Sequence, residues 1–428
     1  MLRLLYSLLL LLATPLIMLR LLWRGVRQPE YRRHWRERWG FPSAPPLSRS
    51  IWIHAVSVGE IRATVPLVQR LRAARPGLAI LITCMTPTGR ATAAELYADS
   101  VTCVYLPYDF RSLHRRLIAR FRPVLLVIME TEIWPNLLAA CSVDKLPALL
   151  VNARLSDRSW RGYRRLPPVR RLVHDALQSL HAVAAQTAED GARLANLGAP
   201  AALVTGNVKF DLPLDDALIA LGQGWRQAMP AAKRVLLAAS TRDGEEAMLL
   251  QAYRQAFDAG ERRSMLLVVV PRHPQRFADV DAMLRDSGLR HGRRSEGAPP
   301  ADIEAWLGDS MGEMAAYIAM ADLVFIGGSL LPLGGQNLIE ACAQGRPVLM
   351  GPSTFNFAEA ARLAAAAGAM QQADDAAAVM ELARVLLHDD GVRDRMAASA
   401  LVFARAHAGA TEKTMGLIAP LIDRGDAR

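Results

Sequence analysis

Cysteine is scarce in this sequence, and its residues are scattered. Cys84, Cys103, Cys141 and Cys342 form no C-x-x-C pair, and the few histidines form no cluster at metal-ligand spacing. This pattern excludes a disulfide framework and a structural zinc site. Residues 47–210 contain no G-x-G-x-x-G fingerprint, and the chain has no plausible D-x-D metal motif. We therefore expect neither a bound metal nor another cofactor.

The composition is otherwise that of a large, basic, well-packed protein. With 428 residues and 52% hydrophobic content, the chain is long enough for two α/β domains with sizeable cores. Its formal charge of +10 comes from an excess of arginine, which favours anionic partners such as phosphates, nucleotides, nucleic acid or acidic lipid. Charge alone does not choose among these partners.

Residues 1–23 are predicted to form an apolar membrane-anchor helix. The uncharged run 4–19 spans about 24 Å as a helix, less than the roughly 30 Å hydrocarbon core unless Arg3 and Arg20 reach toward the headgroups. No small-x-small cleavage site precedes the basic region, so we interpret the helix as an uncleaved anchor. Whether the anchor spans the bilayer or lies in its interface stays open.

A basic juxtamembrane segment and linker, residues 24–46, follows the anchor. Aromatic residues interrupt its arginines, and residues 42–46 are rich in proline. The arginines beside and within it are Arg20, Arg24, Arg27, Arg32, Arg33, Arg36 and Arg38. The positive-inside rule places this side in the cytoplasm, and arginine with tryptophan suits an anionic membrane surface better than nucleic acid.

Strands and helices then alternate, which predicts βα units around parallel sheets. One series fills residues 47–210. A second opens with a strand at 235–239 and belongs to a domain covering residues 211–428, which ends in Ala-rich helices. Two Rossmann-like domains facing a cleft are the economical architecture, with the last helix packing back across the domains.

Glu60 lies where a buried strand, residues 51–54, turns through Gly59 into a helix. Ligands of open α/β sheets bind beyond the carboxyl ends of the strands, so this carboxylate is a candidate functional group. Ser57 and Glu60 also have the S-x-x-E spacing of a capping box, in which the glutamate only satisfies a free backbone amide. Local pattern leaves both interpretations open.

Two further acids, Glu130 and Glu132, follow the strand at 125–129 and precede a helix predicted to start at Pro135. Glu132 is interpreted as an acid that stabilises the helix dipole. Glu130 is closer to the strand end, so a functional role and a dipole role are both open for it.

The second half has two candidate phosphate-binding segments. Arginines at 272 and 276 follow the strand at 268–270, where they either bind phosphate or lie in a solvated loop. A strand near 325 ends in paired glycines, and a second pair, Gly334 and Gly335, is predicted to open a helix whose amides hold phosphate. Glu340, one turn into that helix, is either a ligand for ribose hydroxyls or a surface acid.

These segments together resemble the Kdo transferases, GT-B glycosyltransferases that transfer 3-deoxy-D-manno-octulosonic acid (Kdo) from CMP-Kdo to a lipid A precursor. The resemblance covers nearly the whole chain. Its blocks are the N-terminal anchor and residues 54–60, 129–135, 206–211, 240–242, 271–277, 312–314 and 327–340.

The resemblance implies that Glu60 is the catalytic base and that Glu130 and Lys209 stabilise the transition state. It implies CMP binding by nine residues, namely Pro271, Arg272, Gly312, Glu313, Met314, Asn337, Leu338, Ile339 and Glu340. The family pattern Gly-Gly-His-Asn-Pro-Leu-Glu-Pro is altered here, with Gln336 in place of the histidine and Leu338, Ile339 and Ala341 at three other positions. The consequence of Gln336 stays open.

The implied function is inverting transfer of Kdo to lipid IVA in lipopolysaccharide synthesis. The implied location is the inner membrane, with the catalytic domains on the cytoplasmic side and anionic lipid as a partner. Arginines of residues 111–120 and 161–165 either extend a basic surface toward the acceptor's phosphates or, as we favour for any single one of them, lie on a solvated helix face. The rival classes are a sugar-nucleotide epimerase with the same fold and a non-catalytic membrane-bound nucleotide-binding module. The number of sugars transferred and the oligomeric state stay open.

Overall fold

The computed structural model describes residues 1–426, without the side chains of residues 27 and 424–426. The expectation for the Arg27 side chain therefore lies outside the described residues, as do residues 427 and 428 of the expected second domain. The chain forms two compact units, which we call unit 1 (residues 1–212 and 408–428) and unit 2 (residues 213–407).

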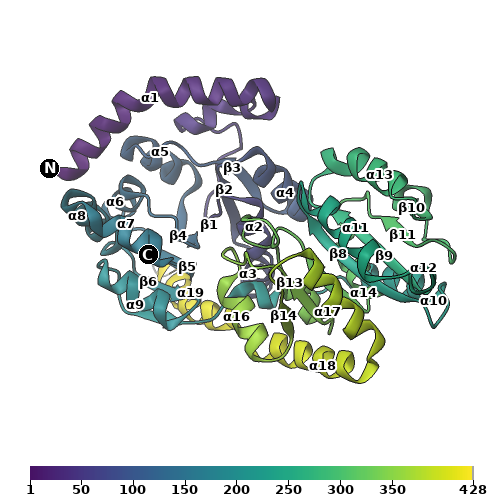
Figure 1. Ribbon diagram of the computed structural model, residues 1–428. Coiled ribbons are helices and arrows are strands. Elements are labelled where there is room, and N and C mark those ends of the chain that lie inside the picture. Colours follow the sequence, from purple (N-terminus) through teal and green to yellow (C-terminus); the bar gives the residue numbers. More distant parts are fainter. Residues whose placement is uncertain (427–428) are drawn as a thin grey trace. The chain divides into compact units, whose positions relative to one another are not determined.

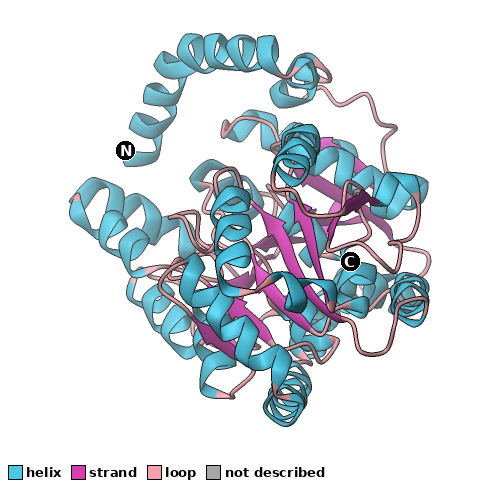
Figure 2. Cartoon of the chain, turned by 45° about the vertical axis from the view of Figure 1, so that its right-hand side comes forward, coloured by secondary structure: helices cyan, strands magenta, loops and turns pink. Residues whose placement is uncertain are grey.

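Unit 1 is built on a parallel sheet of seven strands in the order β3-β2-β1-β4-β5-β6-β7. Its strands are β1 (Ser50–His54), β2 (Ala79–Cys84), β3 (Thr102–Tyr105), β4 (Pro123–Met129), β5 (Ala148–Ala153), β6 (Ala182–Ala185) and β7 (Ala202–Val204). Alternate residues of one strand enter separate cores: Ile51 and Ile53 lie in one, Trp52 in the other. Helices cover both faces of such a sheet, which explains why its strands read as continuous apolar runs (Figure 2).

The helices of unit 1 connect these strands or flank the sheet. They are α1 (Leu2–Arg27), α2 (Val58–Ala63), α3 (Val65–Ala74), α4 (Pro87–Tyr97), α5 (Arg111–Phe121), α6 (Pro135–Val143), α7 (Asp157–Arg165), α8 (Pro167–Leu177), α9 (Ala188–Asn196) and α19 (Ala410–Asp426). Short 3-10 turns are η1 (Pro29–Arg32), η2 (Trp35–Trp39), η3 (Ala98–Ser100) and η4 (Val208–Asp211). Helix α1 is the purple ribbon of Figure 1, and it bends along its length. Pro15 lies inside it, which accounts for the bend because proline cannot donate the interior hydrogen bond.

Unit 2 repeats the plan with strand order β10-β11-β9-β8-β12-β13-β14, again all parallel. The strands are β8 (Arg234–Thr241), β9 (Met265–Pro271), β10 (His291–Arg293), β11 (Ala305–Leu307), β12 (Leu323–Ile326), β13 (Val348–Met350) and β14 (Met370–Gln372). The helices are α10 (Asp216–Gln227), α11 (Glu245–Ala256), α12 (Ala259–Arg263), α13 (Phe277–Asp286), α14 (Met314–Met320), α15 (Ile339–Ala343), α16 (Ala358–Ala366), α17 (Ala376–His388) and α18 (Asp390–Ala406). Two 3-10 turns, η5 (Pro274–Arg276) and η6 (Arg294–Glu296), complete it. Both units are thus Rossmann-like, as the alternation of strands and helices predicted.

The C-terminal helix packs back toward the first half of the chain, as expected, and it therefore belongs to unit 1 and not to the domain of residues 211–428. Helix α19, the yellow end of the chain in Figure 1, packs against α3, β4 and η4. Asp211 accepts hydrogen bonds from the backbone amides of Gly409 and Thr411, which ties the returning chain to the end of unit 1. Apolar residues of α19, including Ile418 and Ile422, fill one core of the first sheet. An Ala-rich composition indicates a helix but carries no information about which sheet it covers.

Candidate functional site

Glu60 lies in the first turn of α2, directly beyond the carboxyl end of β1. Its carboxylate accepts hydrogen bonds from the Val56 backbone amide (2.7 Å) and the Ser57 hydroxyl (3.0 Å). The Ser57 hydroxyl in turn accepts from the Glu60 backbone amide at 3.4 Å. This is close to a capping box, except that the glutamate accepts from the residue before the N-cap. The structure therefore confirms that Glu60 caps the start of α2. Capping does not prevent the same carboxylate from acting as a catalytic group.

The environment of Glu60 makes its carboxylate unusually basic. Only 8% of the residue is exposed. Burial, and secondarily the negative charges of Glu130 and Glu132, raises the pKa of Glu60 to about 7, although the hydrogen bonds from Val56 and Ser57 oppose the shift. A carboxylate with a pKa near neutrality is suited to general-base catalysis at physiological pH.

Glu130 and Lys209 form an ion pair beside it. Glu130 directly follows β4, which lies next to β1 at the point where the strand order reverses. Ligands of such sheets usually bind at this point. Lys209 Nζ lies 2.8 Å from Glu130 Oε1, and both side chains are largely shielded from solvent. Glu130 has a φ of 57°, a left-handed conformation that costs free energy for a residue with a side chain. The structure thus brings Glu60, Glu130 and Lys209 together within unit 1.

Two asparagines position Lys209. The side chain of Asn152, at the end of β5, accepts a hydrogen bond from the Val208 amide (3.1 Å), and that of Asn207 accepts from the Lys209 amide (3.0 Å). Both bonds hold the η4 turn that carries the lysine. Sequence reasoning missed Asn152, and the only available signal was a polar residue at the end of an apolar strand.

The start of α6 is held by Asp109 and not by Glu132, contrary to expectation. The buried carboxylate of Asp109 accepts hydrogen bonds from the amides of Asn136 (3.1 Å) and Leu137 (2.9 Å), the free donors of that helix. Glu132 instead accepts from the Trp134 indole at 2.9 Å, and burial raises its pKa. Asp109 follows β3, so a residue distant in the sequence supplies the negative charge that favours this helix start. The predicted start at Pro135 is confirmed.

In unit 2, the expected CMP-binding residues follow strands β9, β11 and β12, whose carboxyl ends lie on the same edge of the sheet, with β8 between β9 and β12. Arg272 follows β9, and its amide donates to the carbonyl of Thr241 at the end of β8 (2.9 Å). Burial, and then the nearby charges of Arg242 and Arg272, lowers the pKa of His273. Two cationic side chains therefore lie close together beside His273, as a site for a phosphate requires.

A buried glutamate shapes the glycine loop at this edge. Glu245, at the start of α11, is fully buried, and its carboxylate accepts hydrogen bonds from the amides of Gly328 (2.6 Å), Leu330 (2.9 Å) and Arg242 (2.9 Å). These bonds fasten the loop after β12 to the loop after β8, across the point where the strand order reverses. Sequence reasoning missed Glu245 because an acid in the first turn of a helix is common.

The second glycine pair does not open a helix as predicted. Gly334 and Gly335 both have positive φ in an irregular segment, and α15 begins only at Ile339 and is five residues long. The side chain of Asn337 accepts from the Ile339 amide (3.1 Å) and donates to Glu340 (2.9 Å). The predicted helix start at the glycine pair is therefore wrong, whereas phosphate binding by the amides at the start of α15 stays a prediction.

The remaining CMP-binding candidates contribute in different ways. Leu338 and Ile339 are buried, and both belong to the apolar core of unit 2 rather than to its surface. Gly312 has a φ of 85°, which glycine adopts without strain, and Met314 begins α14. The Glu313 carboxylate is paired with the guanidinium of Arg294, both contacts at 2.9 Å.

Two arginines expected to face the membrane or the acceptor instead pack against unit 1. Arg38 is buried, stacks 4.1 Å above the Tyr105 ring and donates to the carbonyl of Met85. Arg120 donates to the carbonyl of Ala44. Arg33 and Arg36, by contrast, are exposed.

Comparisons with known proteins agree with this geometry. Residues 33–212 match the family model described as 3-deoxy-D-manno-octulosonic-acid transferase (kdotransferase). A protein of that name from Bordetella pertussis is 45% identical over 88% of this chain and 89% of its own length. Another from Haemophilus influenzae is 35% identical over 99% of both chains.

The comparisons with solved structures concern the fold. A glycosyltransferase from Rickettsia africae has a TM-score of 0.58 at 11% identity, covering 88% of this chain and 99% of its own. A UDP-GlcNAc 2-epimerase from Neisseria meningitidis also scores 0.58, at 16% identity, covering 88% of this chain and all of its own. Both share the GT-B plan of two Rossmann-like domains. Fold alone does not separate transferase from epimerase, whereas the sequence relatives do. The chain belongs to the 3-deoxy-D-manno-octulosonic acid transferases, a family of glycosyltransferases.

Proposed function

We propose that this protein transfers Kdo from CMP-Kdo to the lipid A precursor lipid IVA, with inversion at the anomeric carbon and with Glu60 as the general base. The observation that carries the proposal is the buried Glu60 carboxylate with a pKa near 7, located at the switch point of a Rossmann-like sheet. Family membership supports the Kdo part of the proposal, and the basic edge of unit 2 supports an anionic nucleotide donor.

In the proposed reaction, a hydroxyl oxygen of the acceptor attacks the anomeric carbon of Kdo while Glu60 accepts the hydroxyl proton. A new carbon–oxygen bond forms on one face of the sugar. The bond between the anomeric carbon and the phosphate oxygen breaks on the opposite face, and CMP leaves as a phosphate monoester. Cationic groups offset the charge that develops on the leaving phosphate.

We assign that electrostatic role to Lys209 in unit 1 and Arg272 in unit 2. Lys209 is held by Glu130 in a fixed position, and a charge that is already in place does not need to reorganise during the reaction. Pro271, the turn at residues 312–314, and residues 337–340 are proposed to contact CMP. The Asn337–Glu340 hydrogen bond supports this assignment, because it orients both side chains before any ligand arrives.

We also propose that the protein acts at the cytoplasmic face of the inner membrane. Residues 2–26 form one helix that is long and apolar enough to cross a membrane, judged by length and composition. Exposed arginines follow it, and these match an anionic lipid surface.

The test is Kdo transfer by membranes that contain wild type or Glu60→Gln, with products resolved by mass. Glutamine keeps one oxygen that can accept the hydrogen bond from the Val56 amide, and its NH2 group can donate to the Ser57 hydroxyl, so we expect the variant to fold and bind CMP while its transfer rate falls by at least 10²-fold. Glu95→Gln, an exposed glutamate of the same unit, is the matched control and should retain full activity. Wild-type turnover in Glu60→Gln would contradict the assignment of the base, and a wild type without transfer would contradict the proposed reaction.

A further inference from the structure

Helix α1 has two distinct sides. Residues that are at least partly buried recur every three or four positions along it, at 2, 6, 10, 13, 17, 21 and 25, and residues 7, 14 and 18 beside them are also partly buried. The other side carries exposed large apolar residues, which are Leu4, Leu5, Leu8, Leu9, Leu11, Leu12, Leu16, Leu19, Leu22, Trp23 and Val26. A water-exposed surface of this kind is rare in soluble proteins and marks an interaction surface.

The N-terminal end of α1 is fastened to unit 1 by polar contacts. The Tyr6 hydroxyl donates to Asp109 Oδ2 (3.0 Å), and the Asn136 side-chain amide donates to the Ser7 hydroxyl (2.9 Å). Asp109 and Asn136 are 2% and 1% exposed, and Asp109 also pairs with His114 at 2.9 Å. These partners belong to the carboxyl edge of the sheet and cannot follow the helix into a bilayer.

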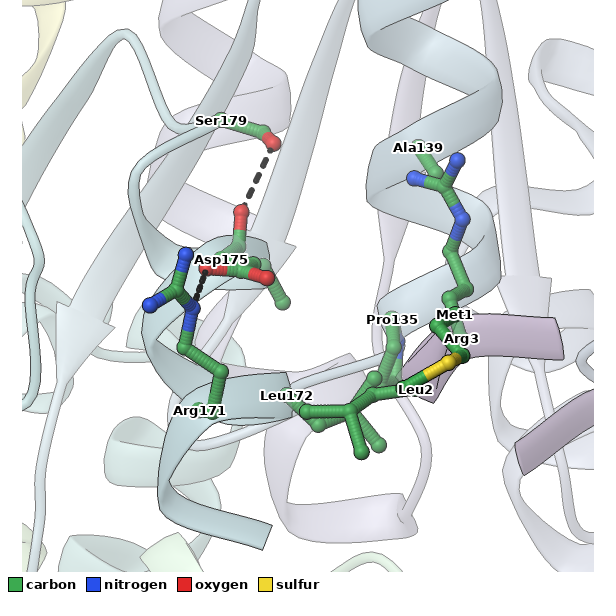
Figure 3. A pocket seen from close by; sticks show the side chains of 10 residues that line it. Met1, Leu2, Arg3, Pro135, Ala139, Arg171, Leu172, Asp175 and Ser179 are labelled. Atoms are coloured by element: carbon green, nitrogen blue, oxygen red, sulfur yellow. Dashed lines mark hydrogen bonds and ion pairs between the residues drawn. The ribbon is translucent and has the colours of Figure 1, made fainter. Parts of the chain in front are cut away.

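The first turn of α1 also forms part of a cavity of unit 1. Met1, Leu2 and Arg3 line a space of about 480 Å³ together with residues of α6 and α8. In Figure 3, Arg171 and Asp175 of α8 are joined on one wall, and Arg3 lies on the opposite side.

The C-terminal end of α1 packs against η1, the turn that directly follows it. The Arg32 side chain packs so closely over Gly25 that a Cβ there would lie 2.6 Å from its Cγ, and the Arg24 guanidinium lies 5.4 Å from the centre of the Tyr31 ring. These contacts are local, because η1 (Pro29–Arg32) directly follows α1, so the N-terminal end is the part of the helix that polar contacts tie to the edge of the sheet.

We propose that α1 lies in the plane of the membrane interface, with its leucine side in the acyl region of one leaflet, and does not span the bilayer. Between Ser7 and Trp23 the helix rises by about 24 Å, so a spanning helix would carry Tyr6 and Ser7 across the hydrocarbon, away from Asp109 and Asn136. An anionic leaflet is the occupant that the charges favour, since the first acidic residue of the chain is Glu30 and Arg3, Arg20 and Arg24 are exposed.

This orientation has a consequence for the acceptor. Asp109 and Asn136 follow β3 and β4, on the same edge of the sheet as Glu60 and Glu130. A leaflet covering α1 therefore borders the edge that carries the candidate base. A lipid-linked acceptor then needs to rise only partly out of the membrane to reach Glu60.

The inference rests on the membrane attachment proposed above and is tested by the accessibility of single cysteines. Arg3→Cys and Arg20→Cys, each in a Cys103→Ser background, are labelled with a membrane-impermeant maleimide in intact spheroplasts and in inverted inner-membrane vesicles. Both positions are exposed, and Cys103 is the native cysteine that is not fully buried. Kdo transfer by the same vesicles reports that the variants fold.

We expect both cysteines to react in inverted vesicles and neither in spheroplasts. Labelling of residue 3 from the spheroplast exterior, with residue 20 labelled only in inverted vesicles, would establish a spanning helix and overturn the inference while leaving the transferase proposal intact. Recovery of active protein in the soluble fraction would overturn the membrane attachment itself. Absence of transfer in the wild type, with the expected labelling pattern in the variants, would contradict only the proposed reaction.

Discussion

At the scale of single residues, Glu60 combines two roles that the sequence presented as alternatives. Its carboxylate completes the cap of α2, and the same enclosure that makes those hydrogen bonds also removes solvent from the charge. Burial is the larger effect, so the net pKa shift is upward. A capping glutamate exposed to water would keep its usual pKa and would be a weak base.

The pH dependence of transfer follows from this shift. A general base must be ionised, so kcat/KM should rise with pH through about 7 and level off above it, instead of near the usual glutamate value. Initial rates between pH 5 and 9 measure this limb. The residual activity of Glu60→Gln should not rise with pH in this range. If kcat/KM of that variant still rises through pH 7 as in wild type, another group controls the rate.

The same ionisation affects stability with the opposite sign. Because the folded-state pKa of Glu60 is raised from 4.5 to about 7, the folded protein holds its proton more firmly than the unfolded chain, and this contribution to stability is lost as pH rises through that window. The loss is at most about 3.5 kcal/mol, since one pKa unit corresponds to about 1.4 kcal/mol. Denaturant unfolding at pH 5 and pH 8 should show Glu60→Gln gaining stability relative to wild type at the higher pH. An equal difference at both pH values would contradict the shift.

At the scale of elements, the edge of unit 2 depends on close contact between two strand ends. A Cβ at Gly327, just after β12, would lie 2.6 Å from both the Ser240 carbonyl oxygen and the Thr241 Cα at the end of β8. Both neighbours are main-chain atoms, which cannot rotate away. Only glycine therefore fits at position 327, because any side chain there would meet the main chain of β8. Glu245 joins the same two loops, since its carboxylate accepts hydrogen bonds from the amides of Arg242 and Gly328.

Gly327→Ala should accordingly destabilise unit 2 by about 1–3 kcal/mol and weaken CMP binding, because the strand ends must separate. Gly224→Ala is the matched control: it lies in the exposed part of α10 with no atom within 4 Å of the added Cβ, and should stabilise by about 0.5–1 kcal/mol. Thermal unfolding and CMP titration measure both effects. Equal stability of the two variants would contradict the contact.

At the scale of the whole molecule, positive charge and exposed apolar surface are concentrated at the N-terminal end of the chain. Arg33 and Arg36 are exposed beside Trp35, whose exposed fraction is 47%. Arginine near an anionic surface contributes about 1 kcal/mol each at low salt, whereas the leucines of α1 contribute through burial that salt does not screen.

Binding to lipid vesicles should therefore have a salt-sensitive and a salt-insensitive part. With anionic vesicles, binding should fall as salt is raised from 0.05 to 0.5 M and then level off above zero; with zwitterionic vesicles it should change little. Arg36→Ser should weaken only the anionic case, and Arg405→Ser, at an exposed arginine of unit 2, should have no effect. Flotation assays give these values, and identical behaviour of the two variants would remove the proposed role of the basic segment.

The sequence by itself determined the local features of this protein. Alternating apolar runs and helical periods predicted the parallel sheets, Glu60 was recognisable at a strand-to-helix turn, and α6 begins at Pro135 as expected. These features depend on residues close in the chain, whose spacing reports directly which side chains are buried.

Only the tertiary structure decided which distant residues meet. Lys209 and Glu130 are 79 residues apart, Asp109 holds the start of a helix that follows the next strand, and α19 returns to unit 1 from the far end of the chain. The two polar contacts that fasten α1 join residues more than 100 positions apart. Such pairs depend on the order of the strands and on which face of the sheet a helix covers. Local periodicity carries no information about either, because the same periodicity fits every arrangement that buries the same side chains.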